Sequence, residues 1–362
     1  MRVLQAGVGA MNEIFRGDNV DVMRRRLADA SVDLVYLDPP FRSGKDYAVA
    51  SVHGARTARP QAAFRDTWSW GPEAEEAYAE VARTGGSVGR TVDALRAIVG
   101  ATDTMAYLCM MAPRLIELRR VMKATASLYL HCDPTASHYL KVLLDGVFGP
   151  ACFRNEIIWR YRRWPARASR FQRMHDVLLF YTAAPGAAHT FHTLYGYEKL
   201  AESTRKTFGT RKQRADFSSG RRKPGVEDVE TEGPPLSDYW DVEVADGGPP
   251  LSDAWEIGVI AAIGKERTGY PTQKPEALLE RVIRASSNED DVVLDPFCGC
   301  GTALAVAHRL KRRWIGIDVS PIAVDMAAAR LRPASGPGLV SADPGEARAS
   351  RGERKRGASG RG

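Results

Sequence analysis

Short, almost wholly apolar segments alternate along the chain with segments of helical period. Residues 32–37 and 292–295 hold too few polar positions for strands with one face in water, so both are expected to be buried on both faces. Before the first of them, residues 21–30 have a helical pattern and residues 12–18 a short strand. Strand, helix, strand predicts a parallel crossover unit, and the expected fold class is α/β with a Rossmann-like sheet.

Hydrophobic and polar positions follow a less regular pattern in the rest of the chain. Residues 42–100 show little periodicity and are expected to form a long, partly mobile excursion from the carboxyl end of the first buried strand. Regular patterns then return: a helix over 105–122 that Pro113 must start or kink, strands over 126–132, 155–161 and 175–182, and a helix opened by Asp133 and Pro134. The last part predicts helix 270–287, strand 292–295, helix 302–310, strand 312–318 and a helix begun by Ser320 and Pro321.

The composition changes between about residues 184 and 258. Eight lysines and arginines lie between Arg205 and Lys223, and residues 225–256 then hold ten acids and no base. One interpretation of both blocks is a solvated, partly flexible insert. The expected division is 1–183 for the first half of the main domain, 184–258 for the insert, 259–332 for the second half, and a disordered basic tail over 333–362.

Charge and cysteine content narrow the class of protein. A net charge of +7 favours a polyanionic partner without proving one. No segment approaches the roughly 20 apolar residues of a membrane helix, and the first residues are too weakly apolar for a signal peptide, so a cytoplasmic protein without a membrane partner is expected. Five scattered cysteines predict reduced thiols. Cys298 and Cys300 lack a second pair, and His131, Cys132 and His138 suit ordinary packing, so no metal site is expected.

The second buried strand ends in Asp295 and runs into a glycine-rich turn. Gly299 and Gly301 let the backbone approach a ligand closely, although a tightly packed turn explains them too. The turn lacks the G-K-[ST] of a phosphate-binding loop, whereas an acid suits a cationic or amine-bearing ligand. The next strand ends in Asp318, where an acid accepts ribose hydroxyls in Rossmann-like sheets. Together these features describe a site for S-adenosylmethionine.

The first buried strand ends in Asp38-Pro39-Pro40-Phe41, and this ending suggests chemistry on a planar base. The prolines make the turn stiff, leaving Asp38 and the Pro39 carbonyl as two acceptors beside the face of Phe41. Two acceptors fit an exocyclic amine, whose freed lone pair could attack a methyl sulfonium in line. Because that amine takes part in base pairing, the base must leave the helix and stack in a pocket. A plain strand-ending turn is the alternative.

With these motifs the sequence resembles the beta-class DNA amino-methyltransferases of bacteria, which methylate N6 of adenine or N4 of cytosine. The family's catalytic [DSN]-P-P-[YF] is matched by residues 38–41 and its cofactor motif D-P-F-x-G-x-G-T by residues 295–302. Residues 270–275, YPTQKP, are similar to H-P-T-Q-K-P, with Tyr270 in place of His. The catalytic motif precedes the cofactor motif, which implies a circularly permuted methyltransferase sheet with the target-recognition region inserted between them.

The resemblance also implies roles for individual residues. Asp38, Pro39, Pro40 and Phe41 would be catalytic. The cofactor would be bound by Asp18, Thr272, Gln273, Lys274, Pro275, Asp295, Pro296, Phe297, Gly299, Gly301, Thr302 and Asp318, with Asp18 near the adenine. DNA contacts would come from Arg160, Arg162, Arg163, Arg167, Arg170 and Arg173, interleaved with aromatic residues; a solvated face is the alternative for this run.

The implied partner is double-stranded DNA, and the implied location is the cytoplasm, at the nucleoid. A homodimer and a separate restriction endonuclease are further partners that the resemblance leaves open. N6 of adenine is favoured as the target because Asp is commoner than Ser at the first motif position of adenine enzymes; N4 of cytosine is the alternative.

Three other activities fit the sequence less well. C5-cytosine methylation needs a cysteine nucleophile, usually in a Pro-Cys pair, and the sequence has no such pair. Methylation of RNA or of a protein amide uses a shorter N-P-P-Y motif, whereas this chain has Asp38, a late cofactor motif and a large insert. An inactive sequence-specific DNA-binding protein would not be expected to keep Asp38 and the cofactor turn intact.

Overall fold

The computed structural model describes residues 12–52, 55–161, 169, 171–194, 213–216, 221–224, 254–260, 264, 266–335 and 340–342. Within these ranges, none of the helices has the length and apolarity that a membrane crossing requires.

Nine of the described strands form one sheet in the order β10-β6-β7-β5-β2-β11-β12-β1-β13. The strands are β1 Glu13–Arg16, β2 Val32–Leu37, β5 Met122–Cys132, β6 Phe153–Arg160, β7 His175–Thr182, β10 Ala254–Glu256, β11 Val292–Asp295, β12 Arg313–Asp318 and β13 Val340–Ala342. β7 is antiparallel to both its neighbours, and the other neighbouring pairs are parallel. The predicted α/β Rossmann-like sheet is confirmed.

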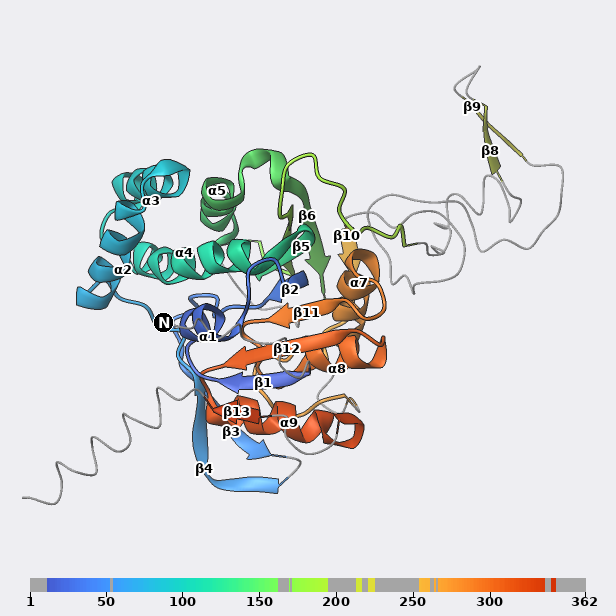
Figure 1. Ribbon diagram of the computed structural model, residues 1–362. Helices are drawn as coiled ribbons and strands as arrows, with labels where there is room; N and C mark the ends of the chain where they lie inside the picture. Colours follow the sequence, from blue (N-terminus) through green and yellow to red (C-terminus); the bar gives the residue numbers. More distant parts are fainter. Residues whose placement is uncertain are drawn as a thin grey trace, which may run out of the picture.

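Helices cover both faces of this sheet (Figure 1). They are α1 Asn19–Arg26, α2 Pro72–Arg83, α3 Gly86–Val99, α4 Asp103–Val121, α5 Ser137–Phe148, α7 Glu276–Ser286, α8 Thr302–Arg309 and α9 Pro321–Ser335. Successive residues of β2 face opposite cores: Val35 packs into the core with α1 to α5, and Leu34 into the core with α7 and α8. Burial on both faces is the physical reason for the apolar β2.

The prediction of a partly mobile excursion over residues 42–100 was wrong. This region contains a hairpin, β3 Tyr47–Val52 with β4 Ala55–Phe64, followed by α2 and α3. Val81 of α2 and Val92 and Leu95 of α3 are buried in the core shared with α4 and α5. The buried side chains are few on each helix, so tertiary packing fixes two helices whose apolar periodicity is weak in the sequence.

Three predicted helix starts also need correction, the first being that of the helix over 270–287, since α7 begins at Glu276. α4 begins at Asp103, where the Thr102 hydroxyl accepts a hydrogen bond from Met105 N, so Pro113 lies inside this helix and does not start it. α5 begins at Ser137, because Asp133 caps a preceding turn by accepting from the backbone amides of Thr135 and Ala136.

The prediction of a disordered tail from residue 333 was wrong for two segments. α9 continues to Ser335, and β13 adds to the sheet beside β1, with Ile14 opposite Val340. An edge strand offers unpaired backbone groups to a passing segment, which is the physical reason for this pairing. The remaining residues of the tail lie outside the described ranges, as does most of the 184–258 insert. Of the insert, β10 extends the sheet beside β6, and β8 Gln213–Asp216 pairs with β9 Arg221–Pro224.

Candidate active site

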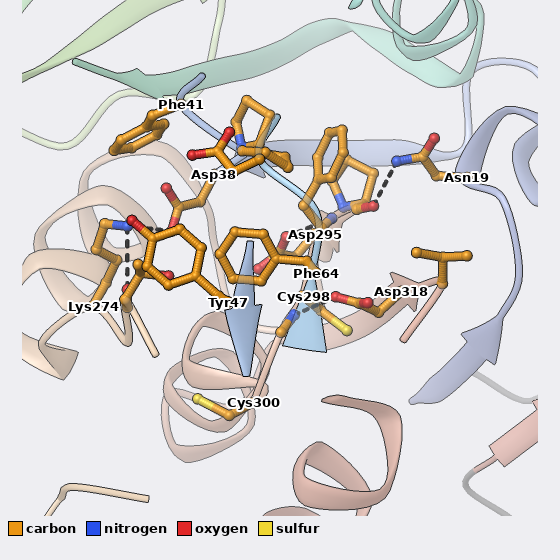
Figure 2. Close-up of a pocket in the computed structure, with 18 of the residues that line it drawn as sticks. Asn19, Asp38, Phe41, Tyr47, Phe64, Lys274, Asp295, Cys298, Cys300 and Asp318 are labelled. Atoms are coloured by element: carbon orange, nitrogen blue, oxygen red, sulfur yellow. Dashed lines mark hydrogen bonds and ion pairs between the residues drawn. The ribbon is translucent and has the colours of Figure 1, made fainter. Parts of the chain in front are cut away.

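Four acids gather where neighbouring parallel strands end. Asp38 follows β2, Asp295 ends β11, Asp318 ends β12, and Asp18 follows β1. All four line one cavity of about 360 Å³, which lies in the size range of small-molecule sites. The sheet therefore places its ligand site at the carboxyl ends of the strands, as expected for this fold (Figure 2).

Most of the predicted cofactor residues line this cavity. The catalytic motif lines it with all four of its residues, and the cofactor set contributes Asp18, Thr272, Gln273, Lys274, Asp295, Pro296, Phe297, Gly299, Thr302 and Asp318. Two members of the predicted set are not among the lining residues: Pro275 precedes α7, and Gly301 precedes α8.

The glycine turn is held by the two strand-end acids. Phe297 N donates to Asp295 Oδ1 at 3.0 Å, and Gly299 N donates to Asp318 Oδ2 at 2.8 Å. Gly301 has φ +75°, and a Cβ there would lie 2.9 Å from the Ala327 Cβ. Glycine is therefore required at 301 by both conformation and close packing.

Burial makes these two acids reluctant to ionise. It raises the pKa of Asp318 to about 6 and the pKa of Asp295 well above its ordinary value, in both cases against the backbone hydrogen bonds that lower it. A ligand that donates hydroxyl or ammonium hydrogens to these carboxylates would offset that cost.

Asp18 and Asn19 connect β1 and α1 to the site. Asp18 Oδ1 caps α1 by accepting from Val20 N at 2.9 Å, while its Oδ2 accepts from Arg114 at 2.6 Å. Asn19 Nδ2 donates to the Pro296 carbonyl at 2.8 Å, as Figure 2 shows. Asn19 Oδ1 is buried without a hydrogen-bond partner among the described residues, so an acceptor there is unused. Sequence reasoning missed Asn19 and Arg114, because their contacts join distant segments.

The catalytic motif and the TQKP segment meet at Asp38. Lys274 Nζ donates to Asp38 Oδ2 at 2.6 Å and lies 4.9 Å from the centre of the Phe41 ring. Asp38 Oδ1 is buried and has no hydrogen-bond partner in the part of the chain that the structure describes. The site therefore presents one unused carboxylate oxygen beside an aromatic face.

In the rest of the TQKP segment, Gln273 forms hydrogen bonds within its own loop. Gln273 Oε1 accepts from the Thr268 amide at 2.8 Å, and its Nε2 donates to the Glu266 carbonyl at 2.7 Å. Tyr270, at the position where the resemblance has His, packs against Gly299: a Cβ on that glycine would lie 3.1 Å from the tyrosine ring. Phe64 of the hairpin stacks on Tyr47 at 4.8 Å and adds a second aromatic wall, which sequence reasoning also missed.

A larger cavity of about 1020 Å³ lies on the other side of this segment. The two cavities share a wall formed by Phe41, Ser43, Tyr47, Tyr270, Thr272, Gln273 and Lys274. Trp159, Tyr161 and Phe171 line the larger one. A planar ring entering from the larger cavity would therefore meet Phe41 at the boundary with the smaller one.

Two of the six predicted DNA-binding arginines are described. Arg173 lines the larger cavity, with its guanidinium 4.0 Å from Asp133 Oδ2. Arg160 ends β6 and lines neither cavity. Arg162, Arg163, Arg167 and Arg170 lie outside the described residues. All five cysteines are buried and free, as expected for reduced thiols, and the described residues contain no cluster of potential metal ligands.

Comparisons with known proteins agree with this arrangement. A family model described as DNA methylase, of the N6/N4 methyltransferase type, matches residues 32–329. The type II methyltransferase M.HpaI of Haemophilus parainfluenzae is 27% identical over 307 residues, which cover 85% of this chain and 70% of that protein. M.EcaI of Enterobacter cloacae, also a type II methyltransferase, is 25% identical, with 85% and 67% covered. TTHA0409 of Thermus thermophilus, crystallised with S-adenosylmethionine, is 17% identical over 91% of this chain and 97% of that one, with a TM-score of 0.48.

An α/β sheet with a ligand cavity at its strand ends defines the class, a Rossmann-like enzyme. Because the family model spans most of its length, the chain belongs to the N6/N4 family of DNA methylases. It is a DNA amino-methyltransferase whose cofactor is S-adenosylmethionine and whose substrate is DNA, which confirms the resemblance. The alternatives of an RNA or protein methyltransferase and of an inactive binder are set aside.

Proposed function

We propose that Asp38 and the Pro39 carbonyl bind the exocyclic amine of a base turned out of double-stranded DNA, while the base stacks on Phe41. The observation that carries this proposal is the buried Asp38 Oδ1, an acceptor without a hydrogen-bond partner among the described residues. Asp38 lines the smaller cavity and Phe41 belongs to the wall that the two cavities share, so an amine brought past Phe41 from the larger cavity would meet this unused acceptor. An unpaired buried acceptor is costly, and an N–H donor removes that cost.

The smaller cavity is the proposed S-adenosylmethionine site. Its fit rests on features of this chain: the tight turn at Gly299, the unused Asn19 Oδ1, and the acids at the strand ends. Asp318 would accept ribose hydroxyls and Asp18 would lie near the adenine. The remaining lining residues of the cofactor set would enclose the amino-acid part. When bound, the cofactor supplies an electrophilic methyl group on a sulfonium.

The chain's own contribution is to position and activate the amine. Its lone pair is conjugated into the base, so it is a weak nucleophile in the free state. Hydrogen bonds from its two N–H groups to Asp38 and the Pro39 carbonyl favour a pyramidal nitrogen with the lone pair exposed toward the smaller cavity. Lys274 fixes the other carboxylate oxygen of Asp38, so the acceptor is held before the base arrives.

The preferred target is N6 of adenine, with N4 of cytosine as the alternative. Support for adenine is the Asp at position 38, which the resemblance associates with adenine enzymes. Both amines present the same two donors to Asp38 and Pro39, so either base suits the proposed chemistry. Recognition of a specific sequence is assigned to the 184–258 insert and the arginines between 160 and 173, as the resemblance implies. The homodimer and the separate restriction endonuclease stay predictions.

The test is to incubate the protein with unmethylated genomic DNA and S-adenosylmethionine, digest to nucleosides and weigh them. N6-methyladenine that disappears with Asp38→Ala would support the proposal. An Asp21→Ala variant is the control, since Asp21 is a surface residue of α1. N4-methylcytosine would overturn only the choice of base, whereas full activity of Asp38→Ala would overturn the role of Asp38.

A further inference from the structure

A buried histidine lies directly behind Asp38. His131, at the carboxyl end of β5, has no solvent exposure. Its Nδ1 lies 3.6 Å from Asp38 Oδ1 and 3.0 Å from the Tyr36 hydroxyl. Its Nε2 lies 3.2 Å from Asp176 Oδ2, on β7. The ring therefore stands between the carboxylate of the catalytic motif and a second carboxylate.

The hydrogen-bond partners fix the tautomer of this ring. Burial raises the pKa of Asp176, but the hydrogen bonds from His131 and Tyr161 and the charge of Lys274 lower it further, and the net pKa is below its ordinary value. Ionised Asp176 can only accept, so His131 carries its hydrogen on Nε2. Burial, and then the charge of Asp38, raise the pKa of Tyr36, which keeps its hydroxyl protonated as a donor to Nδ1. The Nδ1 lone pair faces both the Tyr36 hydroxyl and Asp38, so it can take a proton from Asp38 once that hydroxyl turns away.

The surroundings of His131 come from five segments. Tyr36 and Asp38 face it from the end of β2, Asp176 from β7, and the Trp159 ring from β6 at 5.4 Å. The Phe41 ring lies 5.1 Å away in the turn after β2, and Lys274 reaches the network through Asp38. Tyr161 donates to the other oxygen of Asp176 at 2.9 Å.

We propose that His131 is a positioning residue that receives, through Asp38, the proton released when the amine is methylated, and that Asp176 orients its ring. This inference rests on the proposed function of Asp38. As the N–CH₃ bond forms, the bond between that methyl group and the sulfonium sulfur breaks with its electron pair going to sulfur, and the amine nitrogen is left with a positive charge and two hydrogens. One N–H bond breaks, its electron pair stays on nitrogen, and an O–H bond forms at Asp38 Oδ1. That O–H bond then breaks as Nδ1–H forms, and the charge ends on the imidazolium.

Two neighbours give this transfer its direction. If the proton stayed on Asp38, its carboxyl group would be neutral and the Lys274 ammonium would lose its counter-ion. An uncompensated charge among mostly buried side chains is unfavourable. On His131 the charge is balanced by ionised Asp176. The Nε2 proton can then leave through Asp176, because Asp176 borders the larger cavity. The arrangement resembles the carboxylate-oriented histidines that serve as bases in other enzymes.

The test compares single-turnover methyl transfer across pH 5–9, at saturating cofactor and DNA, in wild type, His131→Gln and Asp176→Asn. We expect His131→Gln to be slowed by about 100-fold, the usual size of general-base effects, and to change the pH dependence of the rate, because the final proton acceptor is missing. Asp176→Asn should be slowed as well, because the ring loses the carboxylate that orients it and balances its charge. Cofactor affinity should change less than about threefold, since neither residue lines the smaller cavity.

Tyr129→Phe is the structural control. It removes a buried hydrogen bond from the same strand, to Ser286 at 2.7 Å, but lies outside the network, so it should keep the wild-type rate and pH profile. A second readout needs no activity: nitrogen-15 NMR of the wild-type side chain should show a neutral ring protonated on Nε2, assigned through its change in Asp176→Asn.

The outcomes separate this inference from the proposed function. If Asp38→Ala is inactive while His131→Gln keeps the wild-type rate and pH profile, the relay is wrong and the role of Asp38 stands. If Asp38→Ala is fully active, the proposed function itself fails. A neutral ring protonated on Nδ1 would also overturn the relay, because that nitrogen could then accept nothing from Asp38. Should His131→Gln not fold, Asp176→Asn and the NMR measurement decide alone.

Discussion

The Lys274 ammonium lies 2.6 Å from Asp38 Oδ2, which joins two motifs 236 residues apart. The side chains are 10% and 18% exposed, so solvent screens this pair only weakly. The ammonium also reaches the Thr272 carbonyl at 3.3 Å. The resemblance implies that Lys274 binds the cofactor, but its charge is directed at the catalytic motif.

This contact predicts that Lys274→Met will damage methyl transfer more than cofactor binding. Removing the ammonium leaves Asp38 as a largely buried charge without its counter-ion, which typically costs about 3 kcal/mol of folding free energy. We expect single-turnover methyl transfer to fall at least tenfold while the calorimetric Kd for S-adenosylmethionine changes less than about threefold. Lys311→Met, which breaks an exposed pair with Glu289, is the matched control and should alter neither. A much higher Kd for S-adenosylmethionine, with a normal rate at saturating cofactor, would indicate instead that Lys274 binds the cofactor.

The sequence was sufficient to predict the parts of the molecule that local pattern determines. β2 and β11 are buried on both faces, so their apolar runs identify them, and the acids that follow them had to lie at one edge because parallel strands end together. The conformation of Gly301 was likewise readable, because few other residues adopt a positive φ.

What the sequence could not provide are contacts between distant segments. Arg114 reaches Asp18 from α4, Lys274 reaches Asp38, and His131 reaches Asp176, and none of these pairs leaves a local pattern. The same limit explains the errors over residues 42–100 and in the tail. There, segments of weak apolar periodicity are fixed by a core and by a sheet edge that lie far away in the sequence.

Cofactor binding should depend on pH through Asp318. Burial raises its pKa from 3.8 to about 6, so between about pH 4 and 6 the folded protein holds a proton that the unfolded chain has lost, and stability falls as pH rises through this window. Ribose hydroxyls donate to the ionised carboxylate, so cofactor binding favours proton loss. If only the ionised form binds, affinity should be about tenfold weaker at pH 5 than at pH 7.

Calorimetry at each pH in two buffers measures both affinity and protons released. Wild type should release close to one proton from Asp318 at pH 5 and almost none at pH 8, and Asp318→Asn should lose this contribution. Asp295, whose pKa is raised further by burial, is checked with Asp295→Asn in the same series. Equal affinities at pH 5 and 7, without proton release, would contradict the assignment of Asp318 to the ribose.

Gly301 should tolerate alanine poorly for two separable reasons. Gly301 has φ +75° and ψ 32°, in the left-handed region, and a Cβ there would lie 2.9 Å from the Ala327 Cβ. The left-handed conformation costs Gly301→Ala about 1 kcal/mol of folding free energy. Overpacking against α9 should cost Gly301→Ala a further 1–3 kcal/mol or so in chemical denaturation.

A double-mutant cycle isolates that second cost. Ala327→Gly removes the atom that the new Cβ would meet, so the double variant Gly301→Ala with Ala327→Gly should be more stable than the sum of the single effects predicts. Ala327→Gly alone should cost about 1 kcal/mol, as glycine does in a helix interior. An absence of coupling between Gly301→Ala and Ala327→Gly would mean that only backbone conformation requires the glycine. In that case the approach of α8 to α9 would not constrain the cofactor turn.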